Sequence, residues 1–125
     1  MKFFKPKKYT FAVRGAVQLE ADTDEDMRRA VCNLVSHIVH ANDIDVRQDL
    51  ISIQFTQTDD IRNANPAREL RTDGYDSVPL FCSLEPRYSD WLELTVRVLV
   101  LYRAAYGHVP RPVYLGGAAN LRNDI

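Results

Sequence analysis

Three side chains that can do chemistry gather within residues 78–97: the thiol of Cys82, the carboxylate of Glu85 and the guanidinium of Arg97. Arg97 stands among apolar neighbours, and a buried cation without a partner is strongly destabilising. We therefore expect a carboxylate beside it, and Glu85 and Glu93 are the candidates. The sequence leaves open whether this ion pair is only structural or belongs to a binding site.

Further arginines stand near the ends of the expected strands and loops. Guanidinium groups bind carboxylates through paired hydrogen bonds, so several arginines around one cleft suit a small ligand with two or more negative charges. The alternative is that they are scattered partners of surface acids. The set comprises Arg14, Arg68, Arg71, Arg97 and Arg122.

The signatures of several enzyme classes are missing from the sequence, which holds no GxSxG, P-loop, GxGxxG or HExxH motif. His37 and His40 lie near each other on an expected helix, but no third ligand follows at a recognisable spacing. We therefore expect neither a metal nor another cofactor.

The composition is that of a globular protein, with 125 residues, 46% hydrophobic and 26% charged. This length predicts a single domain, which we place at residues 11–125 behind a flexible basic leader at residues 1–10. The net charge of -1 gives no general attraction to nucleic acid. A nucleic-acid-binding arm would rest on the short basic leader alone, so we expect no nucleic-acid partner.

Cysteine use and hydropathy bear on the location of the protein. Cys32 and Cys82 form no CxxC pair, and no apolar signal segment precedes the first expected strand, so we expect a reduced, cytoplasmic protein. No apolar run approaches the roughly 18 residues that span a bilayer, so we expect no membrane association.

Strands and helices must position these side chains. Alternating or β-branched stretches predict strands, and a capping residue followed by acids and by apolar residues at three- and four-residue steps predicts a helix. On these grounds we expect strands at residues 9–17, 50–56, 78–82 and 113–115, helices at 22–41 and 89–106, a loop at 57–76 with one helical turn at 67–71, and a tail at 116–125. A loop of that length in a small domain is usually functional.

This order predicts an α+β fold, with a single mixed β-sheet and helices packed on one face. The second expected helix is apolar nearly all round, which indicates a further surface to cover and hence an oligomer.

An ordered set of short segments runs along almost the whole chain from about residue 11. It comprises residues 13–16 (Val-Arg-Gly-Ala), 51–58, 65–68 (Asn-Pro-Ala-Arg) with Arg71, 78–80 (Val-Pro-Leu) with Cys82 and Glu85, Arg97, and 113–115 with 121–122. In this order the segments resemble the AroH-type chorismate mutases, a trimeric and monofunctional family. The resemblance implies an isomerase that converts chorismate to prephenate without a cofactor, in a homotrimeric pseudo-barrel whose clefts lie between subunits.

The resemblance also implies residue roles. Arg97 matches the cation that the family sets against the ether oxygen of the breaking bond. Glu85 and Cys82 match the residues that hydrogen-bond the ring hydroxyl of the substrate, and Arg14 and Tyr114 match the pair that holds the enolpyruvyl carboxylate.

The remaining implied contacts come from the loop and the tail. Arg71 fits the loop arginine when Pro66 is the anchor, and Arg68 is a competing choice that needs gaps. The tail that closes over the site matches Leu121 and Arg122. Further substrate contacts are assigned to Phe81, Asn65 and Ala67.

Two departures from the family pattern fall near the site. Asn65 stands where the family commonly has an aromatic residue, in a loop one residue short, and Glu85 is followed by Pro86, Arg87 and Tyr88. Asn65 could contact a polar ring substituent, and Arg87 could add a charge near Glu85. The departures are compatible with neutral drift, with an enzyme specialised for a relative such as 4-amino-4-deoxychorismate, and with a non-catalytic trimeric module that binds a carboxylate metabolite.

Overall fold

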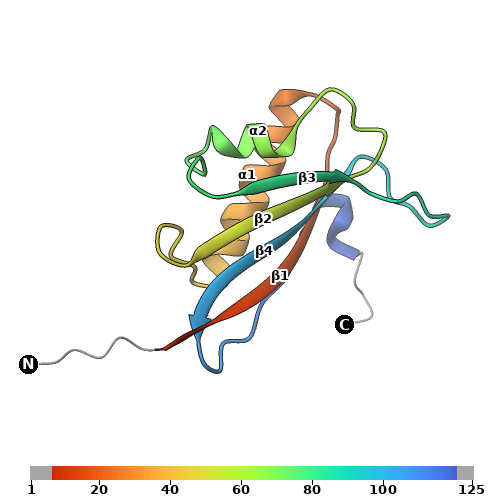
Figure 1. Ribbon diagram of the computed structural model, residues 1–125. Helices are drawn as coiled ribbons and strands as arrows, with labels where there is room; N and C mark the ends of the chain where they lie inside the picture. Colours follow the sequence, from red (N-terminus) through yellow and green to blue (C-terminus); the bar gives the residue numbers. More distant parts are fainter. Residues whose placement is uncertain (1–6, 121–125) are drawn as a thin grey trace, which may run out of the picture.

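The computed structural model describes residues 7–120, except for the side chain of Asn120. Five strands form one sheet in the order β3-β2-β4-β1-β5, accompanied by two α-helices and a short 3-10 helix, η1 (Figure 1). The elements are β1 (Lys8–Gln18), α1 (Asp24–Ala41), β2 (Leu50–Gln57), α2 (Pro66–Arg71), β3 (Leu80–Leu84), β4 (Thr95–Ala105), β5 (Val113–Leu115) and η1 (Gly116–Asn120). No helix among these is long and apolar enough to cross a membrane.

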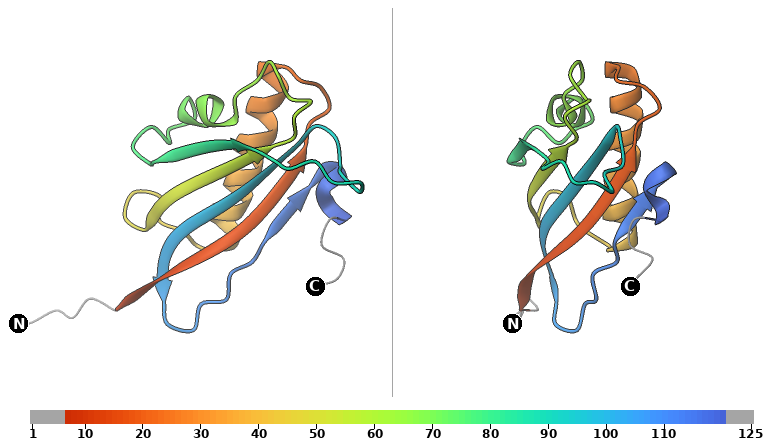
Figure 2. Two further views of the ribbon diagram at one scale, coloured as in Figure 1. Left: turned by 45° about the vertical axis from the view of Figure 1, so that its right-hand side comes forward. Right: turned by 90° about the vertical axis from the view of Figure 1, so that its right-hand side faces the viewer.

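The sheet is mixed, and β4 is its central strand. β4 pairs antiparallel with both β1 and β2, whereas β3 runs parallel to β2 and β5 runs parallel to β1. α1 lies against one face of the sheet, behind the strands in Figure 1 and in the left view of Figure 2. The predicted α+β fold, with one mixed sheet and its helices on one face, is confirmed.

α1 forms where the sequence predicts it because its local signals agree. The side chain of Thr23 caps the helix by accepting a hydrogen bond from the backbone N–H of Asp26 at 3.2 Å, and three acids occupy the first turn. Its apolar side chains recur at helical spacing and are buried against the sheet; they are Met27, Val31, Leu34, Val35 and Ile38.

The predicted helix at residues 89–106 is wrong, because residues 95–105 form the central strand β4. Its buried side chains alternate, with Val96, Val98 and Val100 in the core. The intervening positions carry Leu99 and Leu101, which are only partly exposed and make the run apolar on both faces. A strand between two neighbours is built from such β-branched, doubly apolar runs, and periodicity alone does not separate one from a buried helix.

The other predicted elements shift by small amounts. β3 begins two residues later than predicted, and the helical turn predicted at residues 67–71 is α2. β1 begins at Lys8, whose Nζ lies 2.8 Å from both carboxylate oxygens of Asp49. Residues 8–10 of the expected leader are therefore part of the sheet.

Candidate active site

One row of paired residues crosses four strands and carries the first part of the site. Tyr114 of β5 pairs with Ala16 of β1, Ala16 pairs with Arg97 of β4, and Arg97 pairs with Thr56 of β2. Paired residues point to the same face of a sheet, and Arg14 follows that face because it lies two positions from Ala16. This is the face opposite the core side chains of β4, and we call it the open face.

Glu85 follows the end of β3 and reaches over the open face. Its backbone N–H donates to the carbonyl of Gln57 at 2.8 Å, which fixes the chain beside β2. Its Oε1 lies 2.8 Å from Nε of Arg97, and its Oε2 accepts a hydrogen bond from Thr56 Oγ1 at 3.1 Å. The expected partner of Arg97 is therefore Glu85 rather than Glu93.

The contact between Arg97 and Glu85 is an ion pair rather than a directed hydrogen bond. Nε of Arg97 is buried, and its N–H does not point at an acceptor with hydrogen-bond geometry, although the Glu85 oxygen is only 2.8 Å away. The Arg97 side chain is 40% exposed in spite of its buried Nε, whereas the Glu85 side chain is 16% exposed. The Glu85 carboxylate thus holds the guanidinium of Arg97 at its Nε atom, and the rest of the guanidinium remains accessible to a ligand.

These side chains line a pocket of about 290 Å³ on the open face. The structure brings together four of the predicted site residues there: Arg14, Glu85, Arg97 and Tyr114. Sequence reasoning missed the other lining residues, which are Gly15, Thr56 and Val98. Thr56 could have been found from strand alternation, because it is an outward position of β2.

Gly15 lets the pocket wall pack closely. A Cβ built on Gly15 would stand 2.7 Å from Cδ1 of Ile38 and 2.9 Å from the carbonyl oxygen of Val113. Only glycine therefore allows β5 and α1 to approach β1 at this point, and that approach places Tyr114 beside the arginines.

A second group of predicted residues lies on the other side of the sheet. Cys82 pairs with Phe55, a fully buried core residue, so its thiol faces the helices. Sγ of Cys82 lies 3.8 Å from Oδ1 of Asn65. Burial raises the pKa of Cys82. The backbone N–H of Ala67 and the positive charge of Arg71 act to lower the same pKa, so Ala67 and Arg71 lie beside the thiol. Cys82 and Glu85, which the resemblance assigns to one hydroxyl, thus lie on opposite faces.

The two candidate loop arginines differ in what they contact. Arg68 is bound on α2 by acids: its Nη2 lies 2.7 Å from Asp24, and its Nε lies 3.2 Å from Glu69. For Arg71 no ion pair is found within residues 7–120, and its charge acts on Cys82. The geometry therefore favours Arg71 as the arginine that is free to meet a ligand.

The remaining predicted residues are partly placed. Phe81 of β3 is 66% exposed and pairs with Gln54, which lines the open face. Leu121 and Arg122 lie outside the described residues.

The turn after Glu85 does not bring Arg87 into the pocket. The guanidinium of Arg87 donates to Asp59, with Nε at 3.2 Å from Oδ2, and stacks 4.0 Å from the ring centre of Trp91. Arg87 is not among the residues that line the pocket. The sequence-based suggestion that it adds a charge beside Glu85 is therefore not supported.

A metal site needs several ligand side chains close together. Within residues 7–120, no three His, Cys, Asp or Glu side chains are grouped so that they could hold a metal ion. What the pocket offers a ligand is two guanidinium groups, a phenol, a hydroxyl and one carboxylate.

Known proteins are similar to this chain over most of its length. The family model described as chorismate mutase type I matches residues 10–125. Chorismate mutase AroH of Thermus thermophilus is 34% identical over 114 residues, covering 90% of this chain and 93% of the relative. The protein of the same name from Bacillus subtilis is 28% identical over 118 residues, covering 90% of each. A solved chorismate mutase from Clostridium thermocellum matches with a TM-score of 0.75 and 29% identity, over 86% of this chain and 96% of its own. The chain therefore belongs to the type I family of chorismate mutases, the AroH-type proteins.

Proposed function

We propose that this chain, a chorismate mutase and thus an isomerase, converts chorismate to prephenate in the pocket on its open face. The observation that carries the proposal is the ion pair of Arg97 with Glu85 beside a second guanidinium, Arg14, in one pocket. Two arginines that share a pocket suit an anionic substrate on which further negative charge develops during the reaction.

The reaction explains why such a pocket is sufficient. The rearrangement breaks an ether C–O bond and forms a C–C bond within one molecule, without proton transfer and without a covalent enzyme intermediate. Catalysis must come from holding the flexible substrate in its reactive shape and from stabilising the negative charge that grows on the ether oxygen. A million-fold acceleration requires about 8 kcal/mol, of which one preorganised donor at a developing oxyanion supplies about 3 to 4 kcal/mol.

Arg97 is the donor for the ether oxygen in this proposal. Glu85 holds its Nε side, so the guanidinium does not have to reorganise as the oxygen becomes negative. Arg14 and Tyr114 stand beside it on the open face and bind the enolpyruvyl carboxylate. Glu85 additionally accepts a hydrogen bond from the ring hydroxyl.

The second group completes the site from a neighbouring subunit. Asn65, Ala67, Arg71 and Cys82 lie on the helix-covered side of β3, away from the pocket of their own chain. In a homotrimer with clefts between subunits, these four residues serve the substrate that is bound to the neighbouring subunit. Support comes from the open face, where Leu99 and Leu101 stand partly exposed with no helix of the described chain over them.

This assembly is tested by its mass and by mixing variants. Sedimentation equilibrium should give three times the mass of one chain. Arg97→Ala subunits lack kcat and Arg71→Ala subunits bind chorismate weakly. When the two are mixed after unfolding and assayed at a chorismate concentration well below the KM of Arg71→Ala, activity should exceed the sum of the separate variants, because some clefts then take one intact residue from each chain. A monomer, or no recovery on mixing, would contradict the shared site.

We also propose that the protein is cytoplasmic. Cys32 and Cys82 are both free thiols. Free thiols are usual in the reducing cytosol.

Turnover of chorismate is the direct test of the function. The purified protein is incubated with chorismate and, in parallel, with 4-amino-4-deoxychorismate, and the products are identified by chromatography and mass against the uncatalysed background. Fast formation of prephenate is expected. Turnover of the amino compound alone would indicate a specialised enzyme, and turnover of neither would indicate a binding module.

A further inference from the structure

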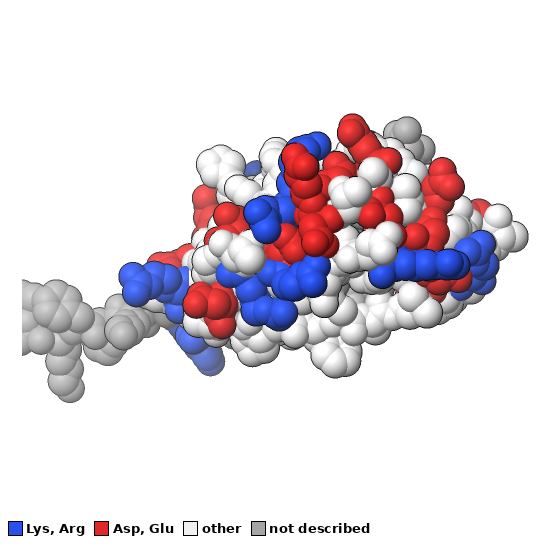
Figure 3. Space-filling model, turned by 90° about the horizontal axis from the view of Figure 1, so that it is seen from above, with Lys and Arg blue, Asp and Glu red and all other residues white. Residues whose placement is uncertain are grey.

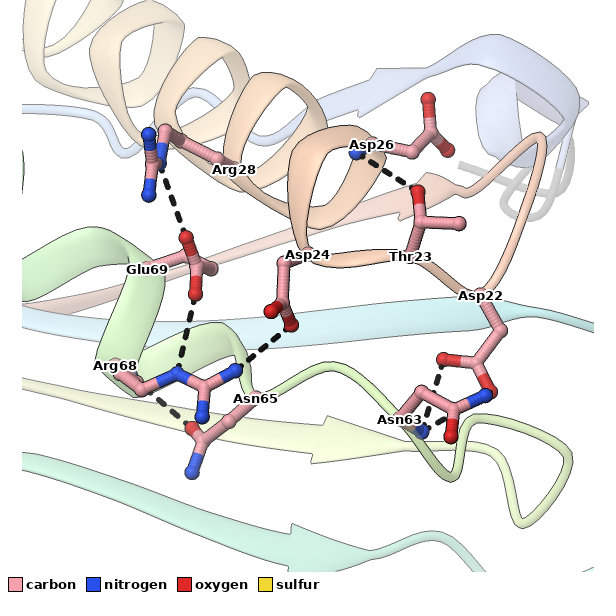
Figure 4. Close-up of polar contacts among 9 residues, drawn as sticks. All are labelled: Asp22, Thr23, Asp24, Asp26, Arg28, Asn63, Asn65, Arg68 and Glu69. Atoms are coloured by element: carbon pink, nitrogen blue, oxygen red, sulfur yellow. Dashed lines mark hydrogen bonds and ion pairs between the residues drawn. The ribbon is translucent and has the colours of Figure 1, made fainter.

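Glu69 of α2 is a nearly buried carboxylate, 3% exposed, at the contact between α2 and α1. Arg28 of α1 donates from Nε to its Oε1 at 3.0 Å, and Arg68 donates from Nε to its Oε2 at 3.2 Å (Figure 4). Both oxygens are thus used. A buried carboxylate that loses its cations is strongly destabilising, so this arrangement holds as a unit.

The same unit reaches the start of α1. Arg68 also donates to Asp24, in the first turn of α1, at 2.7 Å (Figure 4). Just before the helix, Asp22 accepts hydrogen bonds from the backbone N–H groups of Arg62 at 2.7 Å and Asn63 at 3.1 Å. We call Arg28, Glu69, Arg68 and Asp24 the α1–α2 clamp. Figure 3, which looks down on the end of the molecule where α2 lies in Figure 1, shows acidic and basic side chains intermixed there.

α2 depends on such anchoring, because six residues are too few for an independently stable helix. Its other side presents the residues that we assign to the substrate. Oδ1 of Asn65 caps α2 by accepting the backbone N–H of Arg68 at 3.1 Å and contacts Sγ of Cys82. Arg71 acts on the same thiol. The clamp therefore sets where Asn65 and Arg71 point.

We propose that Glu69 is a positioning residue of the enzyme, which fixes α2 on α1 through Arg28 and Arg68 so that Arg71 and Asn65 meet the substrate in the correct place. This inference rests on the proposed function. Arg68 acts within the clamp and not on the substrate. Nothing in the family resemblance assigns a role to Glu69, Arg28 or Asp24.

The test compares Glu69→Gln with a matched control, Asp49→Asn. Asp49 is also a nearly buried carboxylate, 8% exposed, with both oxygens 2.8 Å from Lys8 Nζ, but it lies at the opposite end of β1 from the pocket. Both variants should lower Tm. Only Glu69→Gln should raise KM for chorismate, by about tenfold, as expected for a misplaced charge-assisted contact that acts equally in the ground and transition states. Its kcat should change less than KM.

A double variant tests whether Glu69→Gln raises KM by displacing Arg71. In an Arg71→Ala background, adding Glu69→Gln should raise KM by much less than it does in the wild-type background, because one of the two residues that the clamp positions is already gone. If Glu69→Gln does not fold, Arg28→Gln replaces it, since the Arg28 side chain is 60% exposed and its loss leaves Arg68 on Glu69.

The outcomes separate this inference from the proposed function. An unchanged KM in Glu69→Gln, an equal rise in Asp49→Asn, or full additivity with Arg71→Ala would overturn the positioning role while wild-type turnover stands. A wild-type protein that does not turn over chorismate would overturn the proposed function, and this inference with it.

Discussion

Arg97→Ala is the substitution on which the mechanism depends most directly. The structure holds Arg97 against Glu85 at 2.8 Å, and the rest of the guanidinium lines the pocket. Removing one preorganised donor at a developing oxyanion typically costs about 3 to 4 kcal/mol, so we expect kcat to fall by about two to three powers of ten.

Arg97→Lys should be nearly as damaging, because the guanidinium offers separate nitrogen atoms to Glu85 and to the ligand. A single ammonium nitrogen has to serve both the carboxylate and the ether oxygen, and it lacks the planar fork. The fold should survive both substitutions. The Arg97 side chain is 40% exposed, and an ion pair exposed to that degree is worth at most about 1 kcal/mol.

The assay is the loss of chorismate absorbance under steady-state conditions, with Tm measured on the same samples. Arg103→Ala is the matched control, because Arg103 is an exposed arginine of the same strand and the same face as Arg97, outside the pocket. The control should retain wild-type kcat. Near-wild-type kcat in Arg97→Ala, or a loss of kcat accompanied by global unfolding, would refute the assignment.

Three further substitutions test the remaining site. Arg71→Ala should raise KM about tenfold or more and leave Tm unchanged, because no ion pair of Arg71 is found within residues 7–120. Arg68→Ala should lower Tm and raise KM by less, because Arg68 is bound by Asp24 and Glu69 and acts on the substrate only through the clamp; the reverse pattern in steady-state kinetics would exchange their roles. Asn65→Ser should retain Tm, since serine also caps a helix, but raise KM through loss of the amide N–H groups, whereas Asn65→Ala should additionally lose about 1 kcal/mol in urea unfolding. Gly15→Ala should cost about 1 to 3 kcal/mol in the same unfolding assay, because the new Cβ meets the carbonyl oxygen of Val113 at 2.9 Å.

Local signals were sufficient for α1 and insufficient for β4. At α1 the cap of Thr23, the acids of the first turn and the spacing of the apolar residues all predict a helix, and the structure has one there. At β4 the apolar residues occupy both faces, because one face meets the core and the other is the open face. Which structure such a run adopts is decided by its strand neighbours, β1 and β2, and a neighbour is not visible in a local pattern.

The resemblance identified four of the seven residues that line the pocket, although the pattern misassigned the element that carries Arg97. Arg97 was expected on a helix, yet on β4 it still meets Glu85, because the row through Ala16 and Thr56 brings the two together. What sequence reasoning did not anticipate is the separation of Cys82 from Glu85. Their positions differ by an odd number, and in an extended chain such residues point to opposite sides.

That separation bears on how a complete site is built. Thr56 and Phe55 are consecutive in β2, and they carry the two halves of the site on opposite faces: Thr56 binds Glu85, and Phe55 pairs with Cys82. A strand in the middle of a sheet cannot rotate to bring residues of both faces to the same side, because the rotation would break its hydrogen bonds to both neighbouring strands. If both halves bind one substrate molecule, as the family resemblance implies, the second half must come from another copy of the chain. The geometry of the single chain thus favours a shared cleft over a site enclosed within one subunit.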